Sequence, residues 1–224
     1  MSTILRGVVF DMDGLLLDSE RYVQMAWDLG GERIGWGALG HNIVHTLGMN
    51  HDRRRAYFLE KYGEAFPYDR FCEAYRAAFH ELTREHGVPR KEGGLELMRF
   101  LQKHGVRMAV ATSSSDEYAV RSLKKVGFLP YLDGVVTGGM VEHSKPHPES
   151  YLRACELLGL APQDCMALED APNGIRAAHA AGMYPVMIPD LVKDTAPVDD
   201  LLFGKADSLH DVIPLIREHF ELPE

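Results

Sequence analysis

The sequence has few cysteines, no long apolar run and fewer basic than acidic residues, and each of these shortages excludes a class of protein. Its three cysteines, Cys72, Cys155 and Cys165, are widely spaced and form no Cys-x-x-Cys pair, so neither a disulfide framework nor a zinc site is expected. We interpret them as buried, reduced thiols of a soluble cytoplasmic protein. The apolar stretch Ile4–Phe10 is interrupted by an arginine and is too short for a signal peptide or a membrane span.

The shortage of positive charge bears on the partners. Lys and Arg number 24 against 33 Asp and Glu, which gives a formal net charge of -9. Nucleic acids and membrane surfaces are bound mainly through clustered Lys and Arg, so neither is expected as a partner and a small metabolite fits better. The 224 residues suffice for one sizeable core and a smaller accessory domain. The oligomeric state cannot be read from the sequence, and a monomer is compatible with it.

From residue 90 onward, short apolar runs alternate with amphipathic helical stretches, a pattern typical of a parallel sheet covered by helices. We therefore predict an α/β fold with a Rossmann-like, open parallel-sheet core. The predicted strands are Ile4–Phe10, Val106–Ala111, Gly134–Thr137, Cys165–Leu168 and Tyr184–Ile188. The predicted helices between them are Glu92–His104, Asp116–Val126, Pro148–Leu158 and Ala171–Ala181.

Residues 19–89 break this rhythm and read as an inserted all-helical domain. The helical stretches are Glu20–Leu29, His51–Tyr62 and Tyr68–His86. The glycine-rich segment Gly30–Gly40 is predicted to be a flexible loop. The expected division of the chain is thus 1–18 and 90–224 for the α/β core and 19–89 for the helical insertion.

The strongest functional signal lies at the end of the first predicted strand, where Asp11 and Asp13 flank Met12 and precede Gly14. In open α/β sheets, ligands bind beyond the carboxyl ends of the strands, so both carboxylates are expected at the binding site. Alternation along an extended segment points the two side chains in similar directions. Gly14 permits a tight turn or a close backbone approach.

Later strand ends carry groups that complement these acids. Thr112, Ser113 and Ser114 follow the second predicted strand, where hydroxyls and backbone N–H groups before a helix can hold phosphate oxygens. Lys145 can neutralise a phosphate as a point charge. Glu169 and Asp170, together with Asp11, offer the hard oxygen ligands that Mg²⁺ prefers.

These four segments, in this order, resemble the signature motifs of the haloacid dehalogenase (HAD) superfamily, in its phosphatase and β-phosphoglucomutase-like branch. Members of this branch carry a helical cap between the first two motifs, which corresponds to residues 19–89 of this sequence. The resemblance covers essentially the whole chain. It implies a HAD-like fold in which Asp11 is the nucleophile and Asp13 is the general acid and base, whose backbone carbonyl also binds the metal. It further assigns the motif hydroxyl to Thr112, the motif lysine to Lys145 and the acidic pair to Glu169 and Asp170. Ser113 and Ser114 are expected to contact the substrate phosphate.

The function that the resemblance implies is a Mg²⁺-dependent phosphatase, a phosphoric monoester hydrolase that acts on a small phosphorylated metabolite such as a sugar phosphate or nucleotide monophosphate. Mg²⁺ and Lys145 would offset the repulsion between Asp11 and the phosphate. An aspartyl-phosphate intermediate divides hydrolysis into two easier steps, and Asp13 assists both by proton transfer.

A phosphomutase that resembles β-phosphoglucomutase is the alternative. In the segment Gly48-Met49-Asn50-His51, His51 stands where mutases have a phosphate-binding arginine, and Val23 replaces a histidine that some mutases carry. Both differences favour the phosphatase. Dehalogenases lack the second aspartate, whereas Asp13 is present, and Lys61 does not fall where a phosphonatase needs its lysine. A non-enzymatic binding module is the third class.

In the predicted cap, Arg53, Arg54 and Arg55 begin a helix, where positive charge opposes the helix dipole. They read either as an anion site or, more simply, as a solvated face. The histidines of this region, His41, His45 and His51, show no metal-ligand spacing.

Overall fold

The structure, a computed structural model, describes residues 3–46, 49, 51–191 and 195–223. Its contacts divide the chain into two compact units, one made of Met1–Leu17 with Arg90–Glu224 and the other of Asp18–Pro89. These bounds differ by one residue, Asp18, from those expected from the sequence. That the units act as core and cap remains a prediction. Among the described residues, no helix is long and apolar enough to cross a membrane.

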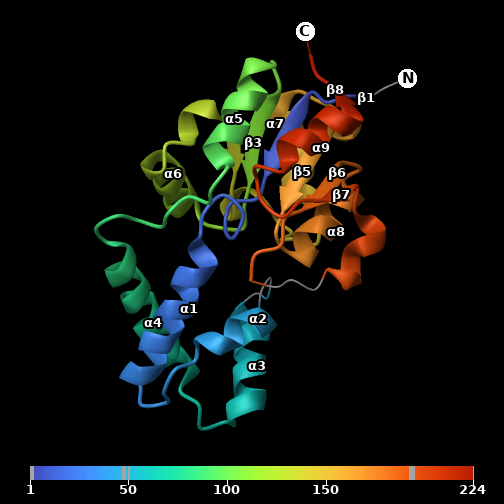
Figure 1. Cartoon of the computed structure of the whole chain (residues 1–224). Coiled ribbons are helices and arrows are strands. Elements are labelled where there is room, and N and C mark those ends of the chain that lie inside the picture. The colour runs from blue at the N-terminus through green and yellow to red at the C-terminus, as the bar shows by residue number, and fades with distance from the viewer. Residues whose placement is uncertain (1–2, 47–48, 50, 192–194, 224) are drawn as a thin grey trace. The chain divides into compact units, whose positions relative to one another are not determined.

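The larger unit is built on a six-stranded sheet in which every pair of neighbouring strands is parallel (Figure 1). The strands are β2 Gly7–Phe10, β3 Arg107–Ala111, β4 Gly134–Val136, β5 Cys165–Glu169, β6 Tyr184–Met187 and β7 Gly204–Lys205. Its α-helices are α5 Gly94–Lys103, α6 Asp116–Lys125, α7 Glu149–Leu158, α8 Pro172–Ala180 and α9 Val212–His219. Short 3₁₀ turns are η2 Leu129–Tyr131, η3 Gly138–Met140, η4 Pro162–Asp164 and η5 Ala196–Leu201.

The strand order, β4-β3-β2-β5-β6-β7, places the first of these strands in the middle. After β2 the chain builds one half of the sheet with β3 and β4, and it then crosses to build the other half from β5 onward. The order therefore reverses between β2 and β5. In open α/β sheets this reversal leaves a crevice at the carboxyl ends of the strands, where ligands bind.

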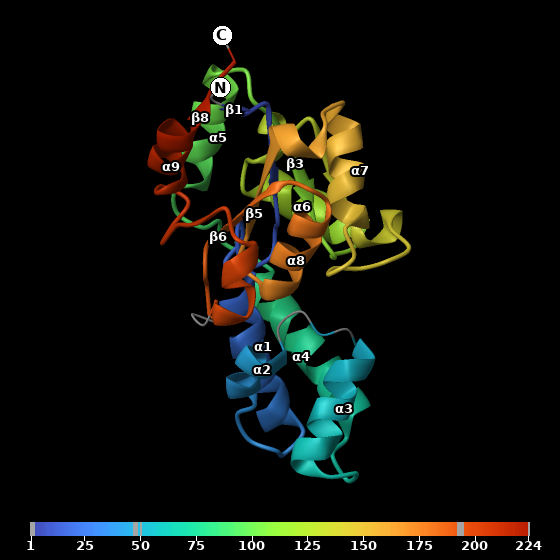
Figure 2. The same ribbon diagram turned by 90° about the vertical axis from the view of Figure 1, so that its right-hand side faces the viewer.

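Helices cover both faces of this sheet, which is why its central strands are mostly apolar. Figure 2 shows α5 and α9 on one side of the sheet and α7 and α8 on the other. All four residues of β2 are buried, as expected for a strand enclosed on both faces. On the α7 and α8 side, Val9 of β2 packs with Ala109, Ala167 and Leu158 in one apolar cluster. The predicted α/β class with an open parallel sheet is confirmed.

The predicted first strand, Ile4–Phe10, is wrong in one respect, because it forms two strands in different sheets. Residues Thr3–Ile4 form β1, which pairs in parallel with β8, Phe220–Glu221, outside the main sheet. The backbone then passes to the main sheet, where the Arg6 carbonyl accepts a hydrogen bond from the Arg107 N–H at 2.9 Å. The two-residue strands β7 and β8 were not predicted, since they are too short to show a periodic pattern.

The second unit is helical in the residues that the structure describes. Its helices are α1 Ser19–Arg33, η1 Gly40–Asn42, α2 Ile43–Thr46, α3 His51–Tyr62 and α4 Tyr68–Thr83. Aromatic rings form its core: the ring centroid of the fully buried Phe58 lies 5.4 Å from that of Trp27, 5.2 Å from that of Phe66 and 5.1 Å from that of Phe71. Offset and edge-on pairs at such distances stabilise beyond the area they bury.

The prediction of a flexible loop over Gly30–Gly40 is wrong at its start, because Gly30 and Gly31 belong to α1. A Cβ added at Gly30 would lie 2.8 Å from the backbone nitrogen of Tyr75 in α4. The glycine therefore allows α1 and α4 to approach closely, and this packing outweighs its low helix propensity. Gly35 and Gly37, with φ angles of +81° and +72°, do lie in the connection that follows.

Candidate active site

The ends of three neighbouring strands bring the predicted site residues together. Phe10 pairs with Leu168 in the register of β2 and β5, so Asp11 and Glu169 leave the sheet side by side. The Asp11 N–H donates to the Leu168 carbonyl at 2.9 Å, which extends the ladder to Asp11. Thr112 follows β3 on the other side and is held by its N–H to the Val136 carbonyl, also at 2.9 Å.

Lys145 joins these strand ends. Its Nζ donates to Asp11 Oδ1 and to Glu169 Oε1, both at 2.6 Å, and to the Ala111 carbonyl at 3.0 Å. The ammonium group also lies 4.8 Å from the ring centroid of Tyr151. The Lys145 side chain is only 9 % exposed, so this cation depends on its two carboxylates for the stabilisation that water would otherwise give.

The pKa values reflect this mutual dependence. Burial acts to lower the pKa of Lys145, but the negative charges of Asp11 and Glu169 outweigh it and raise that pKa above its usual range. Burial raises the pKa of Asp11 to about 7, an effect that the charge of Lys145 opposes and that of Glu169 reinforces. The lysine is therefore cationic at neutral pH, while the pocket still disfavours a full negative charge on Asp11.

A group of three carboxylates, Asp11, Glu169 and Asp170, forms the centre of the site, and we call it the acidic group. One oxygen from each side chain lies within 4.8 Å of the others, and the residues are 9 %, 1 % and 6 % exposed. Three buried carboxylates exceed the one charge that Lys145 supplies. This excess and the all-oxygen donor set are what a divalent cation such as Mg²⁺ requires, so the group is suited to hold a metal ion.

Asp13 lies two residues after Asp11, in a tight turn. Gly14 has a φ of +85°, a conformation in which glycine is strongly favoured. The Ser114 hydroxyl donates to Asp13 Oδ2 at 2.6 Å, and the Ser114 N–H donates to Thr112 Oγ1 at 3.1 Å. Burial, followed by the charge of Asp13, raises the pKa of the Tyr118 hydroxyl. Asp13 is thus positioned by the segment that follows β3.

Ser113 and two of the predicted cap arginines differ from the residues above in exposure or in the unit to which they belong. Ser113 is exposed, whereas its neighbours Thr112 and Ser114 are buried or half-buried. Arg54 and Arg55 belong to the helical unit, where Arg54 donates to the Met49 carbonyl at 3.1 Å and Arg55 pairs with Asp69 at 2.6 Å. In the segment that was compared with mutases, residues 48–51, Gly48 and Asn50 lie outside the described residues.

Two further residues shape the site and were not predicted. The Tyr151 hydroxyl donates to Glu169 Oε1 at 2.6 Å and accepts a longer bond, of 3.4 Å, from Lys145 Nζ. A Cβ at Gly174, in α8, would overlap the Glu169 carboxylate, so only glycine leaves room for it. The one available signal for Gly174 was a glycine inside a predicted helix, where it is intrinsically unfavourable. Tyr151 falls in the apolar stripe of its helix and gives no signal of its own.

Comparison with known proteins agrees with this geometry. A family model described as haloacid dehalogenase-like hydrolase matches residues 5–182. The chain belongs to this family. It is 33 % identical over 202 residues to hexitol phosphatase A of Escherichia coli, covering 90 % of this chain and 88 % of that one. It is 34 % identical over 184 residues to fructose-1-phosphate phosphatase of Escherichia coli, covering 80 % of this chain and 94 % of that one.

The fold is shared with a HAD family hydrolase from Deinococcus radiodurans solved with bound phosphate and sodium. The two structures superpose with a TM-score of 0.82 at 24 % sequence identity, over 98 % of this chain and 97 % of the other. The HAD-like fold is thereby confirmed, and so is the prediction of a phosphoric monoester hydrolase: the chain is a HAD phosphatase.

Replacing Tyr151 tests the bond that it donates to Glu169. We expect Tyr151→Phe to lower the free energy of unfolding by ~1.5–3 kcal/mol, because the variant removes a hydrogen bond to a buried charged group. Tyr184→Phe is the matched control, since its half-buried ring packs against Phe203 and Phe220, and it should change the free energy by no more than about 0.5 kcal/mol. Urea unfolding followed by circular dichroism measures both, and equal stability of Tyr151→Phe and the wild type would contradict the assignment.

Proposed function

We propose that this HAD phosphatase hydrolyses the phosphate monoester of a small sugar or sugar alcohol, with Mg²⁺ as its cofactor and Asp11 as its nucleophile. The observation that carries the proposal is the position of Lys145, whose Nζ lies 2.6 Å from Asp11 Oδ1 and 2.6 Å from Glu169 Oε1 within a buried acidic group. This lysine neutralises part of the charge without blocking the second oxygen of Asp11.

Electrostatics explains why both a lysine and a metal ion are needed. A phosphate monoester carries close to two negative charges and would meet the three carboxylates of Asp11, Glu169 and Asp170 in a buried pocket. Two like charges 4 Å apart repel by ~4 kcal/mol at the effective dielectric constant near a protein surface. Lys145 offsets one of these charges. A bound Mg²⁺ would add two positive charges and would polarise a phosphoryl oxygen. Asp11, Glu169, Asp170 and the backbone carbonyl of Asp13 would hold it.

The chain's own residues then account for the two chemical steps. In the first, an oxygen of Asp11 forms a bond to phosphorus, the bond to the ester oxygen breaks, and Asp13 gives that oxygen a proton so that it leaves as an alcohol. In the second, Asp13 takes a proton from water, whose oxygen bonds to phosphorus, and inorganic phosphate leaves with regeneration of the Asp11 carboxylate. The hydroxyl of Ser114, 2.6 Å from Asp13 Oδ2, supports this role by fixing the carboxyl group. Thr112, Ser113 and Ser114 are proposed to bind phosphoryl oxygens through hydroxyl and N–H groups.

The proposed substrate class follows from the relatives. Hexitol phosphatase A and fructose-1-phosphate phosphatase, both about one third identical to this chain, are named for phosphorylated polyols and sugars. The second is covered over 94 % of its length, so the shared sequence is not confined to a motif. A phosphorylated sugar or sugar alcohol is therefore proposed ahead of a nucleoside monophosphate.

A substrate panel tests this class. We expect release of inorganic phosphate from hexose and hexitol phosphates with a kcat/KM at least about tenfold above that for nucleoside monophosphates, which corresponds to ~1.4 kcal/mol of preferential transition-state binding. Asp11→Asn serves as the inactive control. Isomerisation of β-glucose 1-phosphate in the presence of a bisphosphate primer, with no phosphate released, would instead identify a phosphomutase.

Pre-steady-state kinetics separates the roles of the two aspartates. With p-nitrophenyl phosphate, whose weakly basic leaving group needs no proton, Asp13→Asn should release a burst of one nitrophenolate per enzyme and then turn over roughly 10²–10⁴-fold more slowly than the wild type. Asp11→Asn should show no burst, because no phosphoryl acceptor remains. Asp207→Asn, an exposed change in the same unit, should match the wild type. A burst in Asp11→Asn would refute the assignment of the nucleophile.

Metal dependence provides a separate test. A chelator should abolish hydrolysis and added Mg²⁺ should restore it, since the acidic group keeps its excess negative charge without the cation. Asp170→Asn removes one charged oxygen donor and should raise the dissociation constant for Mg²⁺ at least about tenfold, as measured by titration calorimetry. Asp207→Asn is again the control. Full activity in the chelator, or unchanged Mg²⁺ affinity in Asp170→Asn, would contradict the metal assignment.

A further inference from the structure

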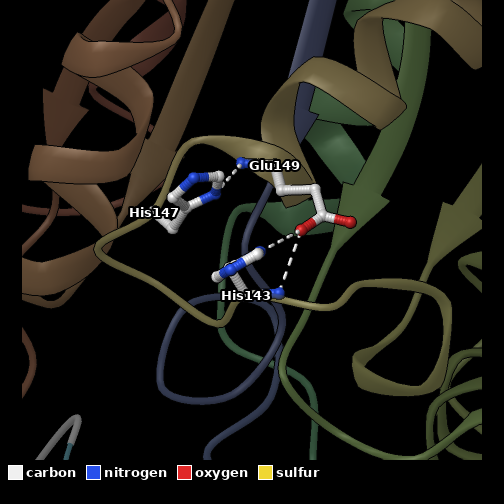
Figure 3. Close-up of side chains that lie close together, drawn as sticks. All are labelled: His143, His147 and Glu149. Atoms are coloured by element: carbon white, nitrogen blue, oxygen red, sulfur yellow. Dashed lines mark hydrogen bonds and ion pairs between the residues drawn. The ribbon is translucent and has the colours of Figure 1, made fainter.

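A second set of metal-ligand side chains lies in the segment that carries Lys145. His143, His147 and Glu149 each offer one ligand atom, and these atoms lie within 4.8 Å of one another. Figure 3 shows the His143 ring beside the Glu149 carboxylate and the His147 ring beside the Glu149 backbone nitrogen, at the start of α7. The ring centroids of His143 and His147 are 4.6 Å apart, with the ring planes inclined by 31°. The acidic group described above contains none of these three residues.

The Glu149 carboxylate is fixed before any ion binds. Its Oε1 accepts hydrogen bonds from the Glu142 N–H at 3.0 Å and from Arg153 Nε at 3.0 Å, while Oε2 accepts one from the His143 N–H at 2.9 Å. Its side chain is 16 % exposed. Metal ligands in proteins are typically oriented by outer hydrogen bonds of this kind, and here backbone and guanidinium groups provide them.

Each of the two histidines has one ring nitrogen in contact with Glu149: His143 with its carboxylate and His147 with its backbone N–H. The Glu149 N–H donates to His147 Nδ1 at 3.3 Å, so this ring nitrogen acts as an acceptor in the contact. His143 Nδ1 lies 3.3 Å from Glu149 Oε2, so a cation placed between these two atoms would have a donor on each side. Both contacts are long for hydrogen bonds, which makes them weak competitors for a metal bond.

Donor chemistry selects the ion. Two imidazoles and one carboxylate suit Zn²⁺ and its neighbours in the first transition row, whereas Mg²⁺ is held by oxygen ligands alone. Tetrahedral bonds of about 2.0–2.2 Å bring donors to about 3.4 Å from one another, so the ligand atoms need to move by little more than 1 Å. The His143 side chain is 62 % exposed and can rotate to close that distance.

We propose that His143, His147 and Glu149 form a binding site for a divalent transition-metal ion of the Zn²⁺ type, with water in the position that no protein ligand fills. The site brackets Lys145, because one histidine lies two residues before it and the other two residues after it. A bound ion would tie both flanks of that segment to the first turn of α7. It would thereby restrain the backbone from which Lys145 reaches Asp11 and Glu169.

Titration calorimetry of the full chain with Zn²⁺, in saturating Mg²⁺ to occupy the acidic group, tests the proposal without relying on turnover. We expect one equivalent to bind, and each of His143→Ala and His147→Ala to raise the dissociation constant at least about tenfold. His86→Ala is the matched control, because His86 is another exposed histidine beside a carboxylate, 3.6 Å from Glu85, and it should leave the affinity unchanged.

The histidine variants are preferred to Glu149→Gln, since the Glu149 carboxylate also holds two backbone N–H groups and its loss can loosen the loop by itself. Co²⁺ provides a second readout, because its visible absorption reports nitrogen and oxygen ligands directly. The absorption of one Co²⁺ equivalent should be lost in both histidine variants and kept in His86→Ala. No binding of Zn²⁺, unchanged affinity in either histidine variant, or equal loss in His86→Ala would overturn the proposal.

Discussion

A single buried cation, the ammonium group of Lys145 between Asp11 and Glu169, is the interaction on which the site depends. Each of the three groups would be costly to bury alone, and removing one partner of a buried ion pair typically destabilises a protein by ~3–5 kcal/mol. Lys145 Nζ lies 2.6 Å from Asp11 Oδ1 and 2.6 Å from Glu169 Oε1. Because they come from positions far apart in the chain, the charges can compensate one another only in the folded sheet. Local charge balance and tertiary structure therefore require each other.

The parallel sheet supplies the precision that this balance needs. The register that pairs Phe10 with Val110 on one side and with Leu168 on the other brings the residues that follow these strands to one edge. Side chains alternate along a strand, so a slip of one residue would turn Asp11 to the opposite face and separate it from Lys145. The reversal of strand order between β2 and β5 then leaves this edge open to a ligand.

Much of this arrangement could be predicted from the sequence, because Asp11, Thr112 and Glu169 lie at the ends of apolar strands whose pattern is local. Their convergence needed only the rule that parallel strands end at the same edge, whereas Lys145 lies in the loop between η3 and α7 and reaches them through its long side chain. What could not be predicted depends on contacts between distant residues. Gly30 is helical because Tyr75 packs against it, and Gly174 is required because Glu169 occupies the space beside it. Tyr151 resembled any other apolar residue of its helix until the fold placed its hydroxyl 2.6 Å from Glu169. That Ser113 and Ser114 bind phosphate remains a prediction.

The first turns of α7 contact both the acidic group and the segment that carries Lys145. Tyr151 reaches into the sheet and bonds to Glu169, while Glu149, two residues earlier in the helix, faces the other way and fixes the backbone N–H groups of residues 142 and 143. An acidic residue in the first turn of a helix is also favoured by the helix dipole. The segment that carries Lys145 is thus held at its far end by the helix that shapes the buried acidic group. Glu149 and Tyr151 lie within one turn of the same rigid helix, so the backbone that Glu149 holds and the hydrogen bonds around Lys145 share one support.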